Sequence, residues 1–113
     1  MAAQTPEGRV KRKTTELLRQ YGLWYFYPGN NGFGKSGIPD IIAIVRGTFV
    51  GIECKADKSK KPTALQLGTG AQIRDAGALW FLVYDEESLQ LLELYIRERL
   101  ADVDRGESAG TGA

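Results

Sequence analysis

Two strand-forming runs joined by a very short connection constrain this chain more than any other feature of its sequence. Residues 40–45 (DIIAIV) and 48–56 (TFVGIECKA) are rich in β-branched and aromatic side chains, and Arg46-Gly47 separates them. Such composition favours strands, and a two-residue connection that ends in glycine favours a hairpin. We therefore predict two central, antiparallel strands that turn at Arg46-Gly47.

The hairpin carries charged side chains at its open end. Alternate residues of a strand share a face, so Glu53 and Lys55 point the same way while Cys54 points into the core. The predicted turn places Asp40 opposite Glu53. Like charges that face each other destabilise a sheet, so the pattern indicates a cation between them, such as Mg²⁺. The alternative is an edge strand with ordinary solvated charges.

The flanking segments predict an α/β fold, in the order helix, three strands, helix, strand, helix. Thr5-Pro6-Glu7 has the cap, proline and acid of a helix start, and Gly22 ends that helix. The resulting architecture is a mixed central sheet flanked by helices. The remaining elements are expected at 24–27 (strand), from Thr63 (helix with a capping box to Gln66), at 78–84 (buried strand) and from Asp85 (last helix).

Length and composition predict one small domain. The chain has 113 residues, of which 42% are hydrophobic, and residues 5–100 form the expected domain. Residues 101–113 (ADVDRGESAGTGA) are expected to form a disordered tail. No segment approaches the roughly 20 apolar residues of a membrane span, and no apolar N-terminal signal is seen. A cytoplasmic location is expected, which is the host cytoplasm for a viral protein.

The complete absence of histidine narrows the possible chemistry. With no His in the sequence, Ser-His-Asp, Cys-His and HExxH zinc sites are excluded. Hydrolysis would have to use carboxylates, lysine and a metal. Residues 1–61 hold 11 Lys and Arg against 5 Asp and Glu, whereas residues 62–113 hold 4 against 9. The basic half is where an anionic partner is expected to bind.

The charged residues of the hairpin resemble a known nuclease signature. Gly37-Ile38-Pro39-Asp40 followed by Glu53-Cys54-Lys55 is similar to the PD-(D/E)xK motif. The longer pattern GIPDIIAIVRG, FVGIECKAD, KPTALQ and AGALWFLV resembles the VRR-NUC branch, known as standalone viral proteins, including phage proteins, and as a domain of the Fanconi-associated nuclease. The resemblance runs from about Glu7 to Tyr84 and implies a restriction-endonuclease-like core.

The resemblance also implies roles for individual residues. Asp40 and Glu53 would bind Mg²⁺ or Mn²⁺, with the Cys54 backbone carbonyl and Glu7 as further ligands. Lys55 would position the attacking water and offset phosphate charge. For Glu7, stabilisation of the helix dipole is the competing interpretation.

One glutamine is also implied at the active site. The resemblance assigns this role to Gln66, provided that its side chain is not used by the capping box. Gln72 is the rival candidate. Basic side chains near the motif are expected to bind DNA phosphates, namely Lys35, Lys58, Lys60, Lys61, Lys11 and Arg12.

These patterns predict a metal-dependent endodeoxyribonuclease that acts on branched DNA. Surplus apolar residues on the last helix (Leu91, Leu94 and Tyr95) suggest a homodimer, which suits the two-fold symmetry of a four-way (Holliday) junction. Alternatives are a monomeric nuclease of flaps or single-stranded ends, a non-catalytic DNA-binding module, and an interaction protein with a solvated acidic helix. No membrane partner and no other protein partner is indicated.

Overall fold

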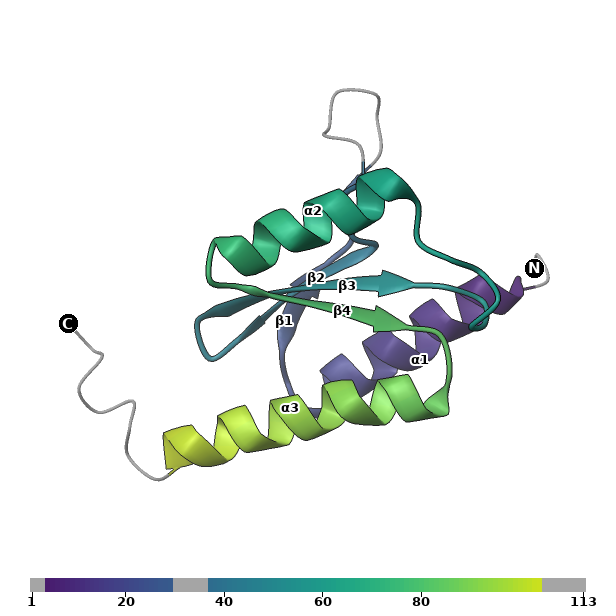
Figure 1. Ribbon diagram of the computed structural model, residues 1–113. Coiled ribbons are helices and arrows are strands. Elements are labelled where there is room, and N and C mark those ends of the chain that lie inside the picture. The colour runs from purple at the N-terminus through teal and green to yellow at the C-terminus, as the bar shows by residue number, and fades with distance from the viewer. Residues whose placement is uncertain (1–3, 30–36, 105–113) are drawn as a thin grey trace.

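The computed structural model describes residues 4–29 and 37–104, which form one mixed sheet with three helices (Figure 1). The predicted order of helices and strands is confirmed. The elements are α1 (Pro6–Gln20), β1 (Trp24–Phe26), β2 (Ile41–Val45), β3 (Thr48–Cys54), α2 (Ala64–Asp75), β4 (Leu79–Val83) and α3 (Glu86–Asp104).

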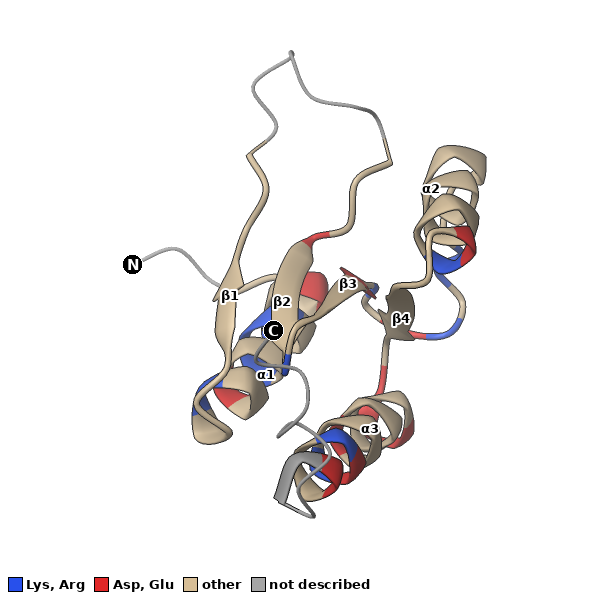
Figure 2. Cartoon of the chain, turned by 90° about the vertical axis from the view of Figure 1, so that its left-hand side faces the viewer, with Lys and Arg blue, Asp and Glu red and all other residues tan. Residues whose placement is uncertain are grey.

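The sheet has the strand order β1-β2-β3-β4. The first three strands are antiparallel neighbours, and β4 pairs with β3 in parallel after the crossover through α2. Helix α2 lies on one face of the sheet, and α1 and α3 lie on the other (Figure 2). Because β3 and β4 run the same way, their carboxyl ends meet at one edge of the domain, on the right in Figure 1.

The β2–β3 hairpin turns where the sequence predicted. Arg46 and Gly47 have φ values of 49° and 87°, and two successive positive φ angles are the geometry of a type I′ turn. The register pairs Val45 with Thr48 at the turn and Ile41 with Ile52 at the open end. Continuing this register by one step places Asp40 opposite Glu53.

The hydrophobic core lies between the sheet and the pair α1 and α3. Alternate residues of β2 and β3 point into it, as expected for strands with one buried face. Helix α1 contributes two leucines and α3 contributes Leu92 and Ile96, both fully buried. The core cluster consists of Leu17, Leu18, Ile41, Ala43, Val45, Val50, Ile52, Cys54, Val83, Leu92 and Ile96.

The last helix extends further than predicted. Helix α3 ends at Asp104, so its last four residues lie in the segment 101–113 that was expected to be a tail. Leu100 packs against the core cluster, and Ala101 and Asp102 are half-buried, which gives this turn of helix tertiary support. Within the described ranges, no helix is both long enough and apolar enough to cross a membrane.

Candidate active site

The predicted site residues converge at the edge of the sheet where β3 ends and β2 begins. Asp40 directly precedes β2, Glu53 lies near the end of β3, and Lys55 follows that strand. The first turns of α1 reach the same edge, which carries Glu7 and Lys11 to it. The hairpin and α1 together therefore build the site.

Asp40 is held by the backbone of the opposite strand. The Cys54 N–H donates a hydrogen bond of 2.8 Å to Oδ2 of Asp40. Pro39 packs on Gly51, where an added Cβ would lie only 2.9 Å from the proline Cγ. Glycine at position 51 thus allows the Pro39-Asp40 segment to lie close against β3.

Glu53 is a buried carboxylate with an unsatisfied oxygen. Its side chain is 1% exposed, and within the described residues its Oε2 has no hydrogen-bond partner. Burial raises the pKa of Glu53 to about 9, and the hydrogen bond and negative charge of Asp40 act in the same direction, whereas Lys55 opposes them. Such a group is costly to keep charged unless a cation reaches it.

Lys11 lies between two of the predicted acidic ligands. Its Nζ is 3.5 Å from Asp40 Oδ1 and 3.6 Å from Glu7 Oε2. Burial lowers the pKa of Lys11, but the charges of Asp40 and Glu7 outweigh that effect and raise it above its ordinary value. Lys11, which was predicted to bind DNA, is thus engaged with carboxylates in this structure.

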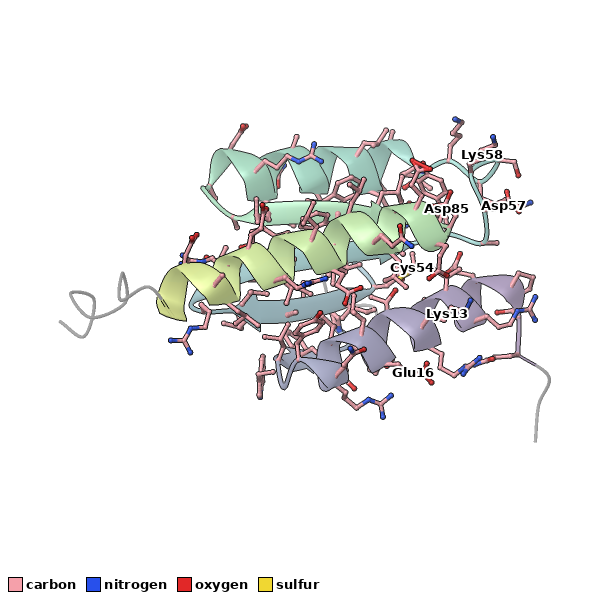
Figure 3. The ribbon with its side chains drawn as sticks, turned by 90° about the horizontal axis from the view of Figure 1, so that it is seen from below. Lys13, Glu16, Cys54, Asp57, Lys58 and Asp85 are labelled. Atoms are coloured by element: carbon pink, nitrogen blue, oxygen red, sulfur yellow. The ribbon has the colours of Figure 1, made fainter. Side chains whose placement is uncertain are left out.

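Cys54 behaves as a core residue at the base of the site. Its side chain is fully buried, its Sγ lies 3.8 Å from Thr14 Oγ1, and burial raises the pKa of the thiol to about 12. A nucleophilic role for this thiol is therefore not supported. Figure 3, seen from the side of α1 and α3, shows Cys54 between these two helices.

The two candidate glutamines lie in different surroundings. Gln66 takes part in the predicted capping box: its Oε1 accepts a hydrogen bond of 2.8 Å from the Thr63 N–H. Its amide oxygen is therefore used by the helix cap. Gln72, on the same helix, lines an apolar hollow on the α2 side of the sheet.

The basic residues predicted to contact DNA divide into separate groups. Lys58, Lys60 and Lys61 line a hollow of about 320 Å³ together with Leu82 and Tyr84. Leu82 is the register partner of Glu53, so this lysine hollow adjoins the carboxylates. Arg12 pairs with Glu16 on the exposed side of α1 at 3.2 Å. Lys35 lies outside the described residues.

The carboxylate pair fits a divalent cation. Asp40 and Glu53 share an edge, one oxygen of Glu53 has no partner among the described residues, and one oxygen of Asp40 already faces an ammonium group. Mg²⁺ is commonly held by one or two carboxylates, with water and substrate phosphate completing its coordination. Over residues 4–29 and 37–104, no three or more Asp, Glu, Cys or His side chains form a metal cluster, and Glu7 forms an ion pair with Lys11.

An apolar hollow beside the site was missed at the sequence level. It measures about 650 Å³ and shares Pro39 with the Asp40 segment. Several of the large apolar side chains around it are exposed, including Phe26 and Phe49. The aromatic run at 24–27 was the available signal, but its outward face could not be assigned without the sheet order. The hollow is lined by Phe26, Pro28, Ile38, Pro39, Ile42, Phe49, Thr69, Gln72, Ile73, Ala76 and Ala78.

Comparison with known proteins finds a similar solved domain. A structure described as a VRR_NUC domain matches with a TM-score of 0.69 and 31% sequence identity. The match covers 78% of this chain and 94% of the other. No protein-family model matches the chain, and no curated protein matches it. The likeness thus spans nearly the full length of the solved domain.

Proposed function

This chain belongs to the VRR-NUC family, and from that premise we propose that it is a metal-dependent endodeoxyribonuclease whose catalytic centre is the Asp40–Glu53 carboxylate pair. The observation that carries the proposal is the buried oxygen of Glu53 beside Asp40, which has no hydrogen-bond partner in the described part of the chain. A module that only bound DNA would gain nothing from two opposed carboxylates near the phosphates.

Each residue of the site has a role that its position supports. Asp40 and Glu53 would hold Mg²⁺ or Mn²⁺, with the Cys54 carbonyl and Glu7 as further ligands. Bound divalent cations in such sites activate water for attack and neutralise charge on the scissile phosphate. Lys55, whose charge reaches Glu53, orients the attacking water and stabilises developing negative charge. Gln66, which caps α2 in this structure, is proposed to contribute its amide only after release from the cap, and Gln72 remains the rival candidate.

The lysine hollow supplies the adjoining DNA contacts. Lys58, Lys60 and Lys61 are exposed and follow β3 directly, one strand away from Glu53. Their spacing along a loop suits successive backbone phosphates, which position DNA without reading its sequence. Arg12 and Lys35 are proposed to extend this surface. Figure 3 shows Lys58 at the end of the domain that also carries the start of α1.

The proposed substrate is branched DNA, with the four-way junction preferred. A domain with one site and phosphate contacts recognises shape more readily than sequence. Two copies related by a two-fold axis would present two sites to opposing strands of a junction. A monomer that trims flaps or single-stranded ends is the alternative.

Cleavage by matched variants tests the proposal. Wild-type protein, Asp40→Asn, Glu53→Gln and Lys55→Ala are incubated with labelled junction, flap and linear duplex in Mg²⁺, in Mn²⁺ and in EDTA. We expect cleavage only with metal, and a loss of at least about a hundredfold in each variant. Glu87→Gln, an exposed carboxylate of α3, is the control that should cleave normally.

A measurement of DNA affinity distinguishes a nuclease from a non-catalytic DNA-binding module. Because the phosphate contacts lie outside the carboxylate pair, Asp40→Asn should bind junction DNA within about threefold of wild type. Wild-type cleavage that continues in EDTA, or undiminished cleavage by Asp40→Asn, would refute the proposed mechanism. Tight binding without any cleavage would favour the non-catalytic module.

A further inference from the structure

Lys11 differs from its basic neighbours on α1 in the carboxylates that its side chain contacts. Arg12 and Lys13 form ion pairs with other carboxylates, Glu16 at 3.2 Å and Glu86 at 3.8 Å. Lys11 instead reaches Asp40, 3.5 Å from its Oδ1, and also contacts Glu7. Figure 3 shows Lys13 and Glu16 on the same helix. The helix thus directs one of three adjacent cations into the carboxylate cluster.

The position of Lys11 is fixed by packing of the helix on the hairpin. Thr14 lies one turn further along α1 and is fully buried against Cys54, with 3.8 Å between Oγ1 and Sγ. Residues three and four positions apart share a helix face. The Thr14–Cys54 contact therefore keeps the face that carries Lys11 turned towards the open end of the hairpin.

Lys11 contacts the oxygen of Asp40 that a divalent cation would need as its ligand. Oδ2 accepts the Cys54 N–H, whereas Oδ1 is the atom that faces Lys11. An ammonium group and a divalent cation cannot both lie against the same oxygen without strong repulsion. Lys11 and a metal thus compete for Asp40.

We propose that Lys11 is a tethered counter-ion of the catalytic carboxylates, which neutralises Asp40 in the metal-free protein and leaves it when a divalent cation binds. This inference rests on the proposed function, because it requires that Asp40 and Glu53 hold the cation. In this scheme Lys11 is not a metal ligand. The competing explanation is a simple Glu7–Lys11 pair that supports α1 alone.

Competition makes a quantitative prediction about metal affinity. Lys11 weakens metal binding by the free energy of its own interaction with Asp40, so its removal should tighten Mn²⁺ binding. The side chain is 37% exposed, and pairs of this exposure are weak, so the expected gain is about three- to fivefold. A pair that supports only the helix would leave Mn²⁺ affinity unchanged.

The experiment measures free Mn²⁺ by electron paramagnetic resonance during titration of the full-length protein without DNA. Lys11→Met and Lys11→Gln should both bind Mn²⁺ more tightly, and Lys11→Arg should resemble wild type because it keeps the charge. Lys13→Met is the matched control: it removes one positive charge from the same helix and should change the affinity less than about twofold. Thermal unfolding checks that each variant is folded.

The outcomes separate this inference from the function on which it rests. Equal Mn²⁺ affinity in wild type, Lys11→Met and Lys11→Gln would overturn the counter-ion role while leaving the metal site intact. A gain in Lys13→Met as large as that in Lys11→Met would overturn it too, because the effect would then be one of net charge. If neither wild type nor any variant binds Mn²⁺, both the proposed metal site and the counter-ion role of Lys11 are refuted.

Discussion

At the scale of single residues, Glu53 shows how function can oppose stability. Its buried carboxyl group has one oxygen without a partner in residues 4–29 and 37–104 and lies beside a second carboxylate, which disfavours the metal-free fold, and its pKa is raised to about 9 mainly by burial. A side chain chosen for stability alone would not be acidic at this position. The arrangement has a physical rationale once a cation is part of the site.

The substitution Glu53→Gln should therefore stabilise the metal-free protein at pH 8. Glutamine keeps the shape, removes the need to take up a proton on folding at this pH, and can donate a hydrogen bond to Asp40. We expect the free energy of unfolding to rise by about 1 kcal/mol or more. Calorimetry in EDTA measures it, with the exposed Glu87→Gln as the control that should change little.

The pH dependence of this effect has a defined sign. Between the ordinary carboxyl value of 4.5 and the folded-state value of about 9, the folded protein retains a proton on Glu53 that the unfolded chain releases. The stability of the metal-free wild type therefore falls as pH rises through this window. The variant should lack this slope and melt close to wild type near pH 4.5. A variant less stable than wild type at pH 8 would contradict this reading of Glu53.

At the scale of secondary-structure elements, the β2–β3 hairpin explains why so much could be predicted. A two-residue turn at Arg46-Gly47 fixes the register, and the register alone brings Asp40 opposite Glu53. Because alternate residues of a strand point to opposite faces, Cys54 then points into the core, whereas Glu53 points to the other face of the sheet. The resemblance to a VRR-NUC domain and the α/β fold are both confirmed by the solved VRR_NUC structure.

Other features depend on tertiary packing and could not be predicted. The sequence did not show which cation of α1 points to Asp40, because that depends on how the helix is rotated against β3. Glycine disfavours a helix interior by propensity, yet Gly70 lies within α2. In the structure a Cβ on Gly70 would lie 2.7 Å from the Trp80 ring, so close helix–strand contact accounts for it. Leu100, near the end of α3, packs against the core cluster, a tertiary contact that the sequence pattern did not show.

The loop between β3 and α2 should control the electrostatic part of DNA binding. Each phosphate contact that is lost lowers the slope of log affinity against log salt by about one. Replacing Lys58, Lys60 and Lys61 together by alanine should thus reduce this slope by about two to three. Fluorescence anisotropy with labelled junction DNA in Ca²⁺, from low to moderate salt, measures it.

A single cation on another surface provides the comparison for the three lysines of the loop. Arg97→Ala removes an exposed cation from α3 and should leave the salt slope within about half a unit of wild type. An unchanged slope in the triple lysine variant would show that DNA follows a different path over the domain.

At the scale of the whole molecule, exposed apolar residues lie on two separate faces. Leu91 and Leu94 on α3 are 59% and 52% exposed, as expected from the surplus apolar residues of that helix. Phe26 and Phe49 surround the hollow on the α2 side. Figure 2 shows that α2 and α3 lie on opposite sides of the sheet. Either face could serve the proposed homodimer.

Sedimentation of variants at micromolar concentration should identify that interface. We expect a dimer for wild type, and a monomer for Leu91→Lys with Leu94→Lys, because buried lysines would disrupt an α3 interface. The control is Phe26→Lys with Phe49→Lys, which should remain dimeric. Reversal of these two results would indicate that the interface lies at the apolar hollow on the α2 side. A monomeric wild type would favour the alternative of a monomeric flap nuclease.

The location of bound Mn²⁺ tests the central claim most directly. Anomalous diffraction from crystals grown with Mn²⁺ should show one strong peak within about 2.0–2.3 Å of an oxygen of both Asp40 and Glu53. In the same map, the Lys11 ammonium should have moved away from Asp40 Oδ1. No peak at this position in the presence of saturating Mn²⁺, or a peak only at other residues, would contradict the assignment of this carboxylate pair as the catalytic metal site.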